Sequence, residues 1–311
     1  MGVKLYKEPE LKNPDLVCSW PGIGNIGLLA VETLQDQVRG EEIGEIDPWE
    51  FFDPHNVIIN DGIIEKMEFP TSKFYHQKIK ERDSLIFIGK EQPSTRGKMY
   101  ASGEKAYRLA NMVLDTAEKF GCRRIYTSGA CVSTSHHESK PRVVAVASSQ
   151  EILQELKKYP NVALMNEINE EGREGVITGL NGSLLALAKK RGMEAVCLMG
   201  EIPDWLSRAP FPYPKASKAI VEVFSQIFQV NIDFTYIEKR DSEVEKIVES
   251  LYEKFPPEVK EQYDQRKTSV QPGPITTEEA QWMKDHLDDF LKSLSEEQGG
   301  EEDDDDDDKP V

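Results

Sequence analysis

The segment DLVCSWPGIGNIGLLAVETLQDQV, residues 15–38, combines a short apolar run, a glycine-rich turn and an amphipathic stretch. Residues 15–20 have the length and composition of a buried strand. The stretch after the glycines carries apolar side chains at helical spacing, namely Leu28, Leu29, Val31, Leu34 and Val38. Gly40 supplies a helix stop. This part of the chain therefore predicts a strand, a tight loop and a helix in succession.

Downstream, the pattern predicts one hairpin and then an alternation of strands and helices. Residues 56–60 and 63–68 flank Asp61-Gly62, which suits a type I′ turn and predicts an antiparallel pair. From residue 84 onward we expect strands at 84–89, 123–130, 142–148, 161–166 and 194–200, and helices at 104–121, 182–191 and 214–230. Alternating strands and helices predict an α/β fold with a mixed, mainly parallel sheet and helices on both faces.

The chain changes character near residue 235, and we divide it there. Residues 1–235 form the expected α/β domain, and 236–295 form a helical extension of two amphipathic helices. The first helix is expected at 242–255, and Thr276 with Glu279 has capping-box spacing for the second. Residues 296–311 hold ten acidic side chains and one lysine, half of the net charge of −18, and we expect this acidic tail to be disordered.

Composition excludes several classes of protein. The 311 residues contain no run of 18 apolar residues, and the first residues lack an apolar signal segment, so we expect a cytoplasmic protein without membrane contact. An acidic chain is repelled by phosphate backbones, so nucleic acid is not an expected partner. The four cysteines have no metal-type spacing and are expected to be free.

Gly22, Gly24 and Gly27 match the G-x-G-x-x-G spacing of a dinucleotide-binding loop between a strand and a helix. Pro21 separates the strand from the first glycine, and strands rather than a β-α-β-α-β unit follow Gly40. We therefore interpret the loop as a tight turn at the edge of a sheet, which could still bind a small anion at the start of the helix.

A second glycine turn begins the helix expected at 182–191, and the strand after it ends at Gly200-Glu201. Binding clefts in α/β sheets lie at such strand ends, although we favour a simple turn and a solvated Glu201. The candidate ligand-binding residues from the two loops are Pro21, Gly22, Gly24, Asn25, Gly27, Gly179, Asn181, Gly182 and Glu201.

His136, His137 and Glu138 are the residues nearest to a metal-binding motif. Neighbouring side chains diverge in strands and helices, so we expect a loop that exposes two imidazoles rather than a metal site. No nucleophile elbow, zinc-protease motif or P-loop is present in the sequence, so we expect no catalytic residues and no cofactor.

Three features together resemble the proteasome assembly chaperone family of the second type, in its archaeal and bacterial branch. They are the PGIGNIG loop, Asp61-Gly62 in the hairpin, and the block ITGLNGSLLALAKKRGMEAVCLMGE. The resemblance covers roughly residues 10–235. It implies a single α/β domain of nucleoside-phosphorylase-like topology, homo-oligomers, and for some members non-enzymatic docking on proteasome α-subunits through a C-terminal hydrophobic–Tyr–any-residue signal. This sequence ends Lys309-Pro310-Val311, so the resemblance supports that route only weakly.

Two hypotheses follow. The first is a homo-oligomeric, non-enzymatic protein of the assembly-chaperone type that binds another protein through its C-terminal amphipathic helices. The alternative is a protein that binds a nucleotide, nucleoside or phosphate, or a ligase- or phosphorylase-like enzyme, with its site at the Pro21–Gly27 loop.

Overall fold

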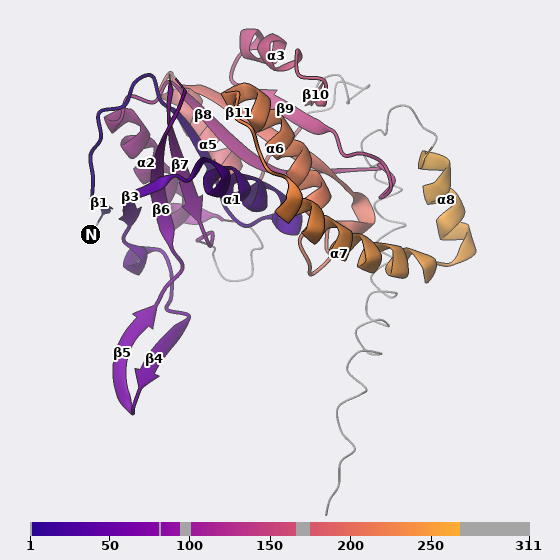
Figure 1. Cartoon of the computed structure of the whole chain (residues 1–311), viewed down its shortest axis with the longest axis horizontal. Coiled ribbons are helices and arrows are strands. Elements are labelled where there is room, and N and C mark those ends of the chain that lie inside the picture. Colours follow the sequence, from indigo (N-terminus) through magenta and orange to yellow (C-terminus); the bar gives the residue numbers. More distant parts are fainter. Residues whose placement is uncertain (1, 81, 94–100, 166–174, 268–311) are drawn as a thin grey trace, which may run out of the picture. The chain divides into compact units, whose positions relative to one another are not determined.

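A nine-stranded sheet forms the centre of the computed structural model, which describes residues 2–80, 82–93, 101–165 and 175–267 (Figure 1). The order of its strands is β1-β3-β6-β7-β2-β8-β11-β9-β10. Their bounds are β1 Val3–Leu5, β2 Asp15–Ser19, β3 Glu41–Ile46, β6 Ser72–Ile79, β7 Arg82–Gly89, β8 Arg124–Ser133, β9 Val143–Ala147, β10 Val162–Leu164 and β11 Glu194–Pro203.

The sheet is mixed, as the sequence predicts. The central strands β7, β2, β8 and β11 are mutually parallel. On one side β1, β3, β6 and β7 pair antiparallel in succession, and on the other β9 is antiparallel to β11 while β10 is parallel to β9. Because β3 pairs with β1 and β6 rather than with β2, the glycine loop after β2 does not belong to a dinucleotide-binding β-α-β unit.

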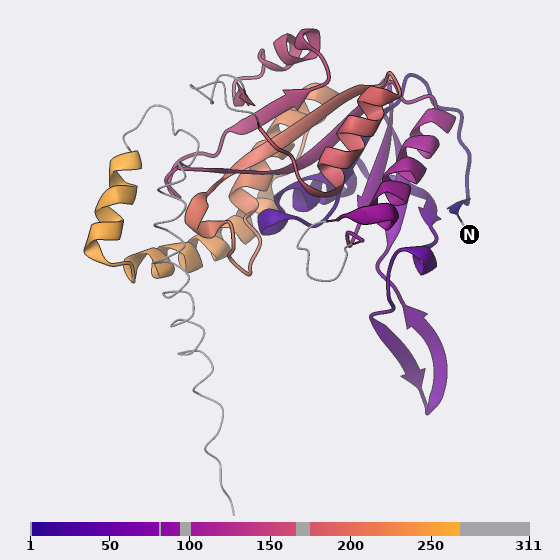
Figure 2. The same ribbon diagram turned by 180° about the vertical axis from the view of Figure 1, so that it is seen from behind.

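Helices cover both faces of this sheet. The helix α1 (Ile26–Val38) packs with α6 (Pro214–Phe228) on one face, and α2 (Gly103–Lys119) packs with α5 (Gly179–Lys190) on the other (Figures 1 and 2). Both faces of the central strands are therefore buried, which explains why apolar side chains occur on both faces of these strands instead of on one face alone.

The C-terminal region differs from the prediction in two respects. Helix α7 spans Thr235–Glu253, longer than expected, and packs against α6 through its buried side chains Ile237, Val244 and Val248. The chain then forms a further helix, α8 (Pro257–Lys267), which was not predicted because its buried side chains are few. The second expected amphipathic helix and the acidic tail lie outside the described residues.

The short helix α3 (Gln150–Leu156), between β9 and β10, was also not predicted.

Strands β4 (Asn56–Asn60) and β5 (Ile63–Glu68) form a separate two-stranded sheet. Asp61 and Gly62 at its turn have φ values of 50° and 80°, so the Asp-Gly pair makes the predicted hairpin. Figures 1 and 2 show the hairpin extending away from the nine-stranded sheet.

Residues Met1–Gly273 form one compact unit, which includes α7 and α8. The division proposed at residue 235 stays a prediction. Among the described residues, no helix has both the length and the apolar composition needed to cross a bilayer.

Candidate functional site

The two glycine loops predicted from the sequence lie next to each other in the structure. Gln92 joins them, since its Nε2 donates to the Pro21 carbonyl and its Oε1 accepts from the Leu180 N–H at 3.1 Å. Ser128 on β8 also contacts both loops: its Oγ donates to the Gly27 carbonyl at 3.0 Å, and its carbonyl accepts from Asn181 Nδ2 at 2.8 Å. Segments about 150 residues apart in the sequence therefore form one site.

A pocket of about 320 Å³ opens between these loops. Three of the nine predicted ligand-binding residues line it: Gly22, Gly27 and Asn181. The remaining lining residues are apolar or uncharged and are Trp20, Ile23, Gln92, Gly129, Ala130, Cys131, Val132, Met165, Val176, Ile177, Thr178, Cys197 and Met199. Asn181 Oδ1 is buried there and has no hydrogen-bond partner among the described residues. The pocket therefore offers the Asn181 amide oxygen as a hydrogen-bond acceptor to a small neutral molecule.

Several predicted residues have roles other than lining this pocket. Gly24 (φ 55°) and Asn25 (φ 47°) turn the chain into α1 through left-handed backbone, and the Gly24 carbonyl accepts from the Tyr213 N–H at 2.8 Å. Gly179 has a φ of 71° at the start of α5. A Cβ on Gly182 would lie 2.1 Å from the Ile177 carbonyl oxygen, so this glycine permits close packing.

The expectation that Glu201 is solvated was wrong. Its side chain is 2% exposed and accepts hydrogen bonds from the backbone N–H, Nε and Nη2 of Arg142 at 3.0, 2.9 and 2.8 Å. Arg142 lies just before β9, 59 residues from Glu201 in the sequence, and its guanidinium donates to both oxygens of the carboxylate. Glu201 therefore acts as a buried ion-pair partner and does not line the pocket.

The cysteine thiols at the pocket are not activated. Burial raises the pKa of Cys131 to about 12 and that of Cys197 to about 11. A nucleophilic cysteine requires the opposite shift, toward a thiolate at neutral pH.

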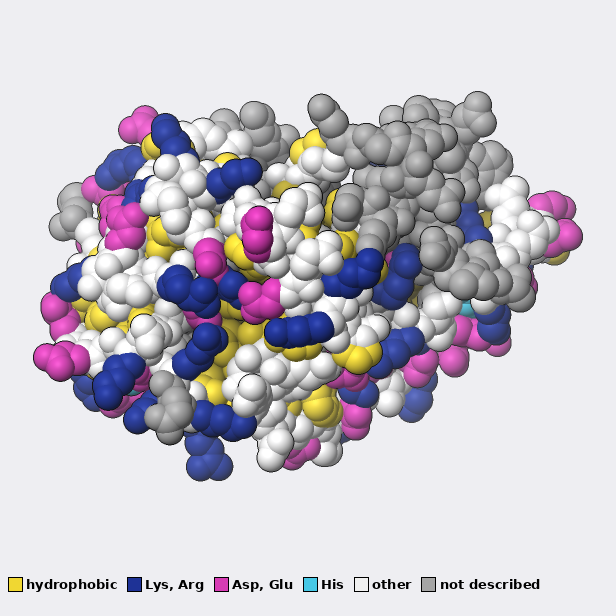
Figure 3. Space-filling model, turned by 90° about the horizontal axis from the view of Figure 1, so that it is seen from above, with side chains coloured by type: hydrophobic (Ala, Val, Ile, Leu, Met, Phe, Trp, Pro, Cys, Tyr) yellow, Lys and Arg dark blue, Asp and Glu magenta, His cyan; other side chains and the backbone are white. Residues whose placement is uncertain are grey.

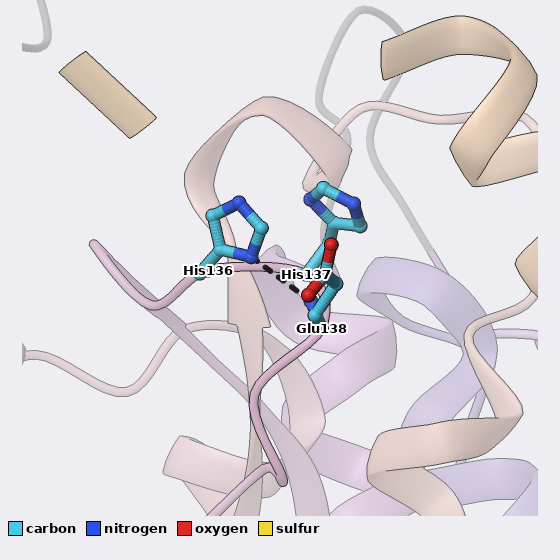
Figure 4. A group of neighbouring side chains, drawn as sticks. All are labelled: His136, His137 and Glu138. Carbon is cyan, nitrogen blue, oxygen red and sulfur yellow. Dashed lines mark hydrogen bonds between the residues drawn. The ribbon is translucent and has the colours of Figure 1, made fainter. Parts of the chain in front are cut away.

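The expectation that His136 and His137 are exposed was also wrong. They are 2% and 5% exposed, because Tyr252 of α7 and Trp205 cover them. Their rings stack with centroids 4.2 Å apart, and Figure 4 shows the Glu138 backbone N–H donating to His136 Nδ1 at 3.2 Å. A loop conformation thus brings together side chains that a strand or helix would separate.

The two histidines and Glu138 each offer one ligand atom, and these atoms lie within 4.8 Å of one another, close enough for the three side chains to converge on a metal ion. Two contacts compete with such a use, because His136 Nδ1 already accepts a hydrogen bond and the Glu138 carboxylate pairs with Lys267 of α8. His136 Nε2 lies 3.4 Å from Asp264 Oδ1, also on α8. The contacts of these three residues with Tyr252 of α7 and with Asp264 and Lys267 of α8 explain the cluster as a site where the two helices pack.

The largest group of exposed apolar side chains lies on the β4–β5 hairpin. Val57 pairs across the strands with Met67, and Ile59 pairs with Ile64, so these four side chains share one face. They are 48%, 47%, 63% and 72% exposed, respectively. We call these four residues the hairpin face. Sequence analysis found the hairpin but not its exposure, since alternation within a strand does not reveal what covers it.

Charge is mixed elsewhere on the surface. On the face shown in Figure 3, Lys and Arg side chains lie among Asp and Glu side chains, although the whole chain has a net charge of −18. Ion pairs join some of the exposed charges of the chain; Lys119, for example, contacts Glu8.

Comparison with known proteins identifies the class. The model of the PAC2 family matches residues 16–252, and the chain belongs to that family. This agrees with the resemblance carried by the glycine loops and the hairpin.

Particular relatives come from archaea and bacteria. A solved structure of PbaB from Pyrococcus furiosus, described as an archaeal proteasome activator, is 27% identical, with a TM-score of 0.66 over 80% of this chain and 97% of that one. A proteasome-assembly chaperone homologue of Mycobacterium tuberculosis is 18% identical, with a TM-score of 0.61 over 80% and 98%, and shows the fold alone. An uncharacterized protein of Methanocaldococcus jannaschii is 28% identical over 242 residues, 78% of this chain and 84% of that protein.

Proposed function

We propose that this protein is a non-enzymatic, homo-oligomeric protein of the assembly-chaperone type that acts in the cytoplasm and binds other protein chains. The observation that carries the proposal is the exposed hairpin face. Apolar groups gathered on an exposed surface mark sites of protein contact, and single scattered ones do not. The likeness to PbaB, which extends over 97% of that chain, makes the proteasome core particle the first partner to test.

The hairpin face has the chemistry of a contact surface. Its four apolar side chains are 47% to 72% exposed, and burying the exposed part of each is worth roughly 1 kcal/mol. Asp61, Glu65 and Glu68 lie on the same hairpin as one basic residue, Lys66, which contacts Glu68, so the hairpin is acidic on balance. A partner would therefore present an apolar groove with basic groups at its edge, and its association would slow at high salt.

The C-terminal helix α7 is a weaker candidate for this contact than the sequence suggested. Its apolar stripe already packs on α6 within the same chain. Among its large apolar side chains, Tyr236 and Ile247 remain exposed, at 64% and 47%.

The test is direct binding of the purified protein to purified proteasome core particles and to free α-subunits, measured by biolayer interferometry at low and physiological salt. Replacing Ile64 and Met67 by serine should weaken binding by at least tenfold, whereas Tyr236→Ser on α7 serves as the matched control and should leave it unchanged. Equal loss in both variants, or no binding of the unmodified protein to either probe, would contradict the proposal.

A second function has its own supporting observation, the pocket that Gly22 and Asn181 line. Since its described lining carries no charged side chain, a neutral nucleoside fits it better than a phosphate or nucleotide. A nucleoside that binds should raise the melting temperature by mass action. Gly22 is extended, and a Cβ there meets no atom within 4 Å, so the backbone accepts a side chain at this position and Gly22→Val places one beside the pocket. It should abolish a nucleoside-induced shift and leave the basal melting temperature unchanged.

A further inference from the structure

Strand β4 has a free edge. In the part of the chain that the structure describes, it pairs with β5 alone, and the hairpin extends away from the nine-stranded sheet (Figures 1 and 2). A free edge presents backbone N–H and C=O groups to any strand that can reach them. An isolated two-stranded hairpin is also only marginally stable in water, so further pairing would strengthen it.

The two edges of the hairpin differ in their chemistry. Native proteins protect a sheet edge with charged residues, proline or a bulge. Strand β5 has Glu65, Lys66 and a bulge, because the register shifts between Ile58 and Ile59 and leaves Glu65 without an opposite residue. Strand β4 reads Asn-Val-Ile-Ile-Asn and has no charge and no proline. The edge of β4 is therefore unprotected.

The sequence of β4 is also nearly symmetric about Ile58. When two copies of this strand run antiparallel about a two-fold axis at Ile58, each Asn56 lies opposite Asn60 of the second copy, and each Val57 lies opposite Ile59 of the second copy. A two-fold interface places one surface against itself, so it needs this kind of self-complementarity. No like charges face each other, and the opposed side chains share faces as an antiparallel ladder requires.

We propose that two copies of this chain associate through β4, antiparallel across the two-fold axis at Ile58, to form a four-stranded sheet. The inference rests on the homo-oligomeric state proposed above and names the surface that produces it. In the paired form the two hairpin faces become one continuous apolar face of eight side chains. Five residues of strand pairing form a small contact, well below the roughly 1,600 Å² of a standard interface, so the association should depend on concentration.

Two double variants test the register. Val57→Lys with Ile59→Lys places like charges opposite each other twice across the axis. Val57→Glu with Ile59→Lys removes the same two apolar side chains but places opposite charges there. Within the hairpin both sites face the neutral Met67 and Ile64 across the strands. Residues 57 and 59 share one face of β4, so the folding of the two variants is compared by thermal melts before their association is compared. The dissociation constant of the like-charge variant should be about 30-fold higher than that of the opposite-charge variant.

The measurement is sedimentation velocity of the full-length chain over a range of concentrations, with thermal melts to confirm equal folding. An opposite-charge variant that associates and a like-charge variant that does not would support pairing through β4. If both variants are monomeric, the apolar face and not the strand register holds the copies together, and the inference is wrong. If both associate like the unmodified protein, the oligomer is real but uses another surface. A monomeric unmodified protein would overturn the inference and the proposed oligomer together.

Discussion

Acidification should destabilise this protein through the buried His137 side chain. Burial lowers the pKa of His137 to about 4 from its usual 6.5, and His136 and the nearby Lys215 and Lys267 act in the same direction, whereas Glu138 opposes them. In the unfolded chain the imidazole takes up a proton near its usual pKa, whereas in the folded chain it stays neutral. The unfolded state therefore binds more protons between about pH 6.5 and pH 4, and stability falls as the pH drops through that range.

The magnitude follows from the size of the shift. A change of 6.5 to about 4 is worth about 2 to 3 kcal/mol at pH 4.5, since each pKa unit corresponds to about 1.4 kcal/mol. For a compact unit of this size, that loss lowers the melting temperature by roughly 5 °C. His136 adds to the loss, because burial lowers its pKa as well.

The assay compares urea unfolding at about pH 7.5 and about pH 4.5 for the unmodified protein and for His137→Phe. Phenylalanine keeps an aromatic ring between Tyr252 and Trp205 but cannot titrate. The loss of stability on acidification should be smaller in this variant by about 2 to 3 kcal/mol. His55→Asn is the control, because His55 is exposed on the surface. Equal pH dependence of His137→Phe and the unmodified protein would refute the burial of this imidazole beneath α7.

Three further substitutions test the packing that positions the site. Gly27→Ala should destabilise the fold by about 2 kcal/mol or more in thermal melts, because its Cβ would lie 2.2 Å from the Ser128 carbonyl oxygen; an unchanged melting temperature would show that α1 and β8 are farther apart. Glu201→Ala should cost about 3 kcal/mol because it removes the buried carboxylate that pairs with the Arg142 guanidinium, whereas a ligand-binding Glu201 would leave stability intact and alter thermal shifts instead. Val248→Asp should release α7 from α6 and increase its amide hydrogen exchange, and continued protection of α7 would contradict the packing described.

The elements that could be predicted are those whose signal is local. Asp61 and Gly62 specify their turn because both adopt positive φ, and α5 follows from a glycine start and an apolar stripe. Helix α8 lacked such a signal, since among its described side chains only Val259 and Tyr263 are buried.

Burial imposed by distant segments could not be predicted. The sequence around His136 and His137 resembles an exposed loop, and Tyr252, more than 110 residues later, covers both rings. Glu201 looked solvated for the same reason, because its partner Arg142 arrives from another strand connection. Conversely, the sequence predicted the antiparallel pair but not the exposure of the hairpin face, which depends on the absence of a packing element among the described residues.

The three glycines of the Gly22–Gly27 loop show why composition alone does not define a ligand site. Glycine permits close approach of the backbone, and the approaching group can be a ligand or the protein itself. At Gly27 the approaching group is the protein itself, since Ser128 occupies the space where a Cβ would lie. Gly24 is needed for the turn, since its φ is 55°. A Cβ on Gly22 would meet no atom within 4 Å, and this residue lines the pocket together with Asn181. Any ligand contact of this loop therefore depends on Gly22, opposite Asn181 of the second loop. Gly27 is explained by the packing of α1 on β8, and Gly24 by the turn.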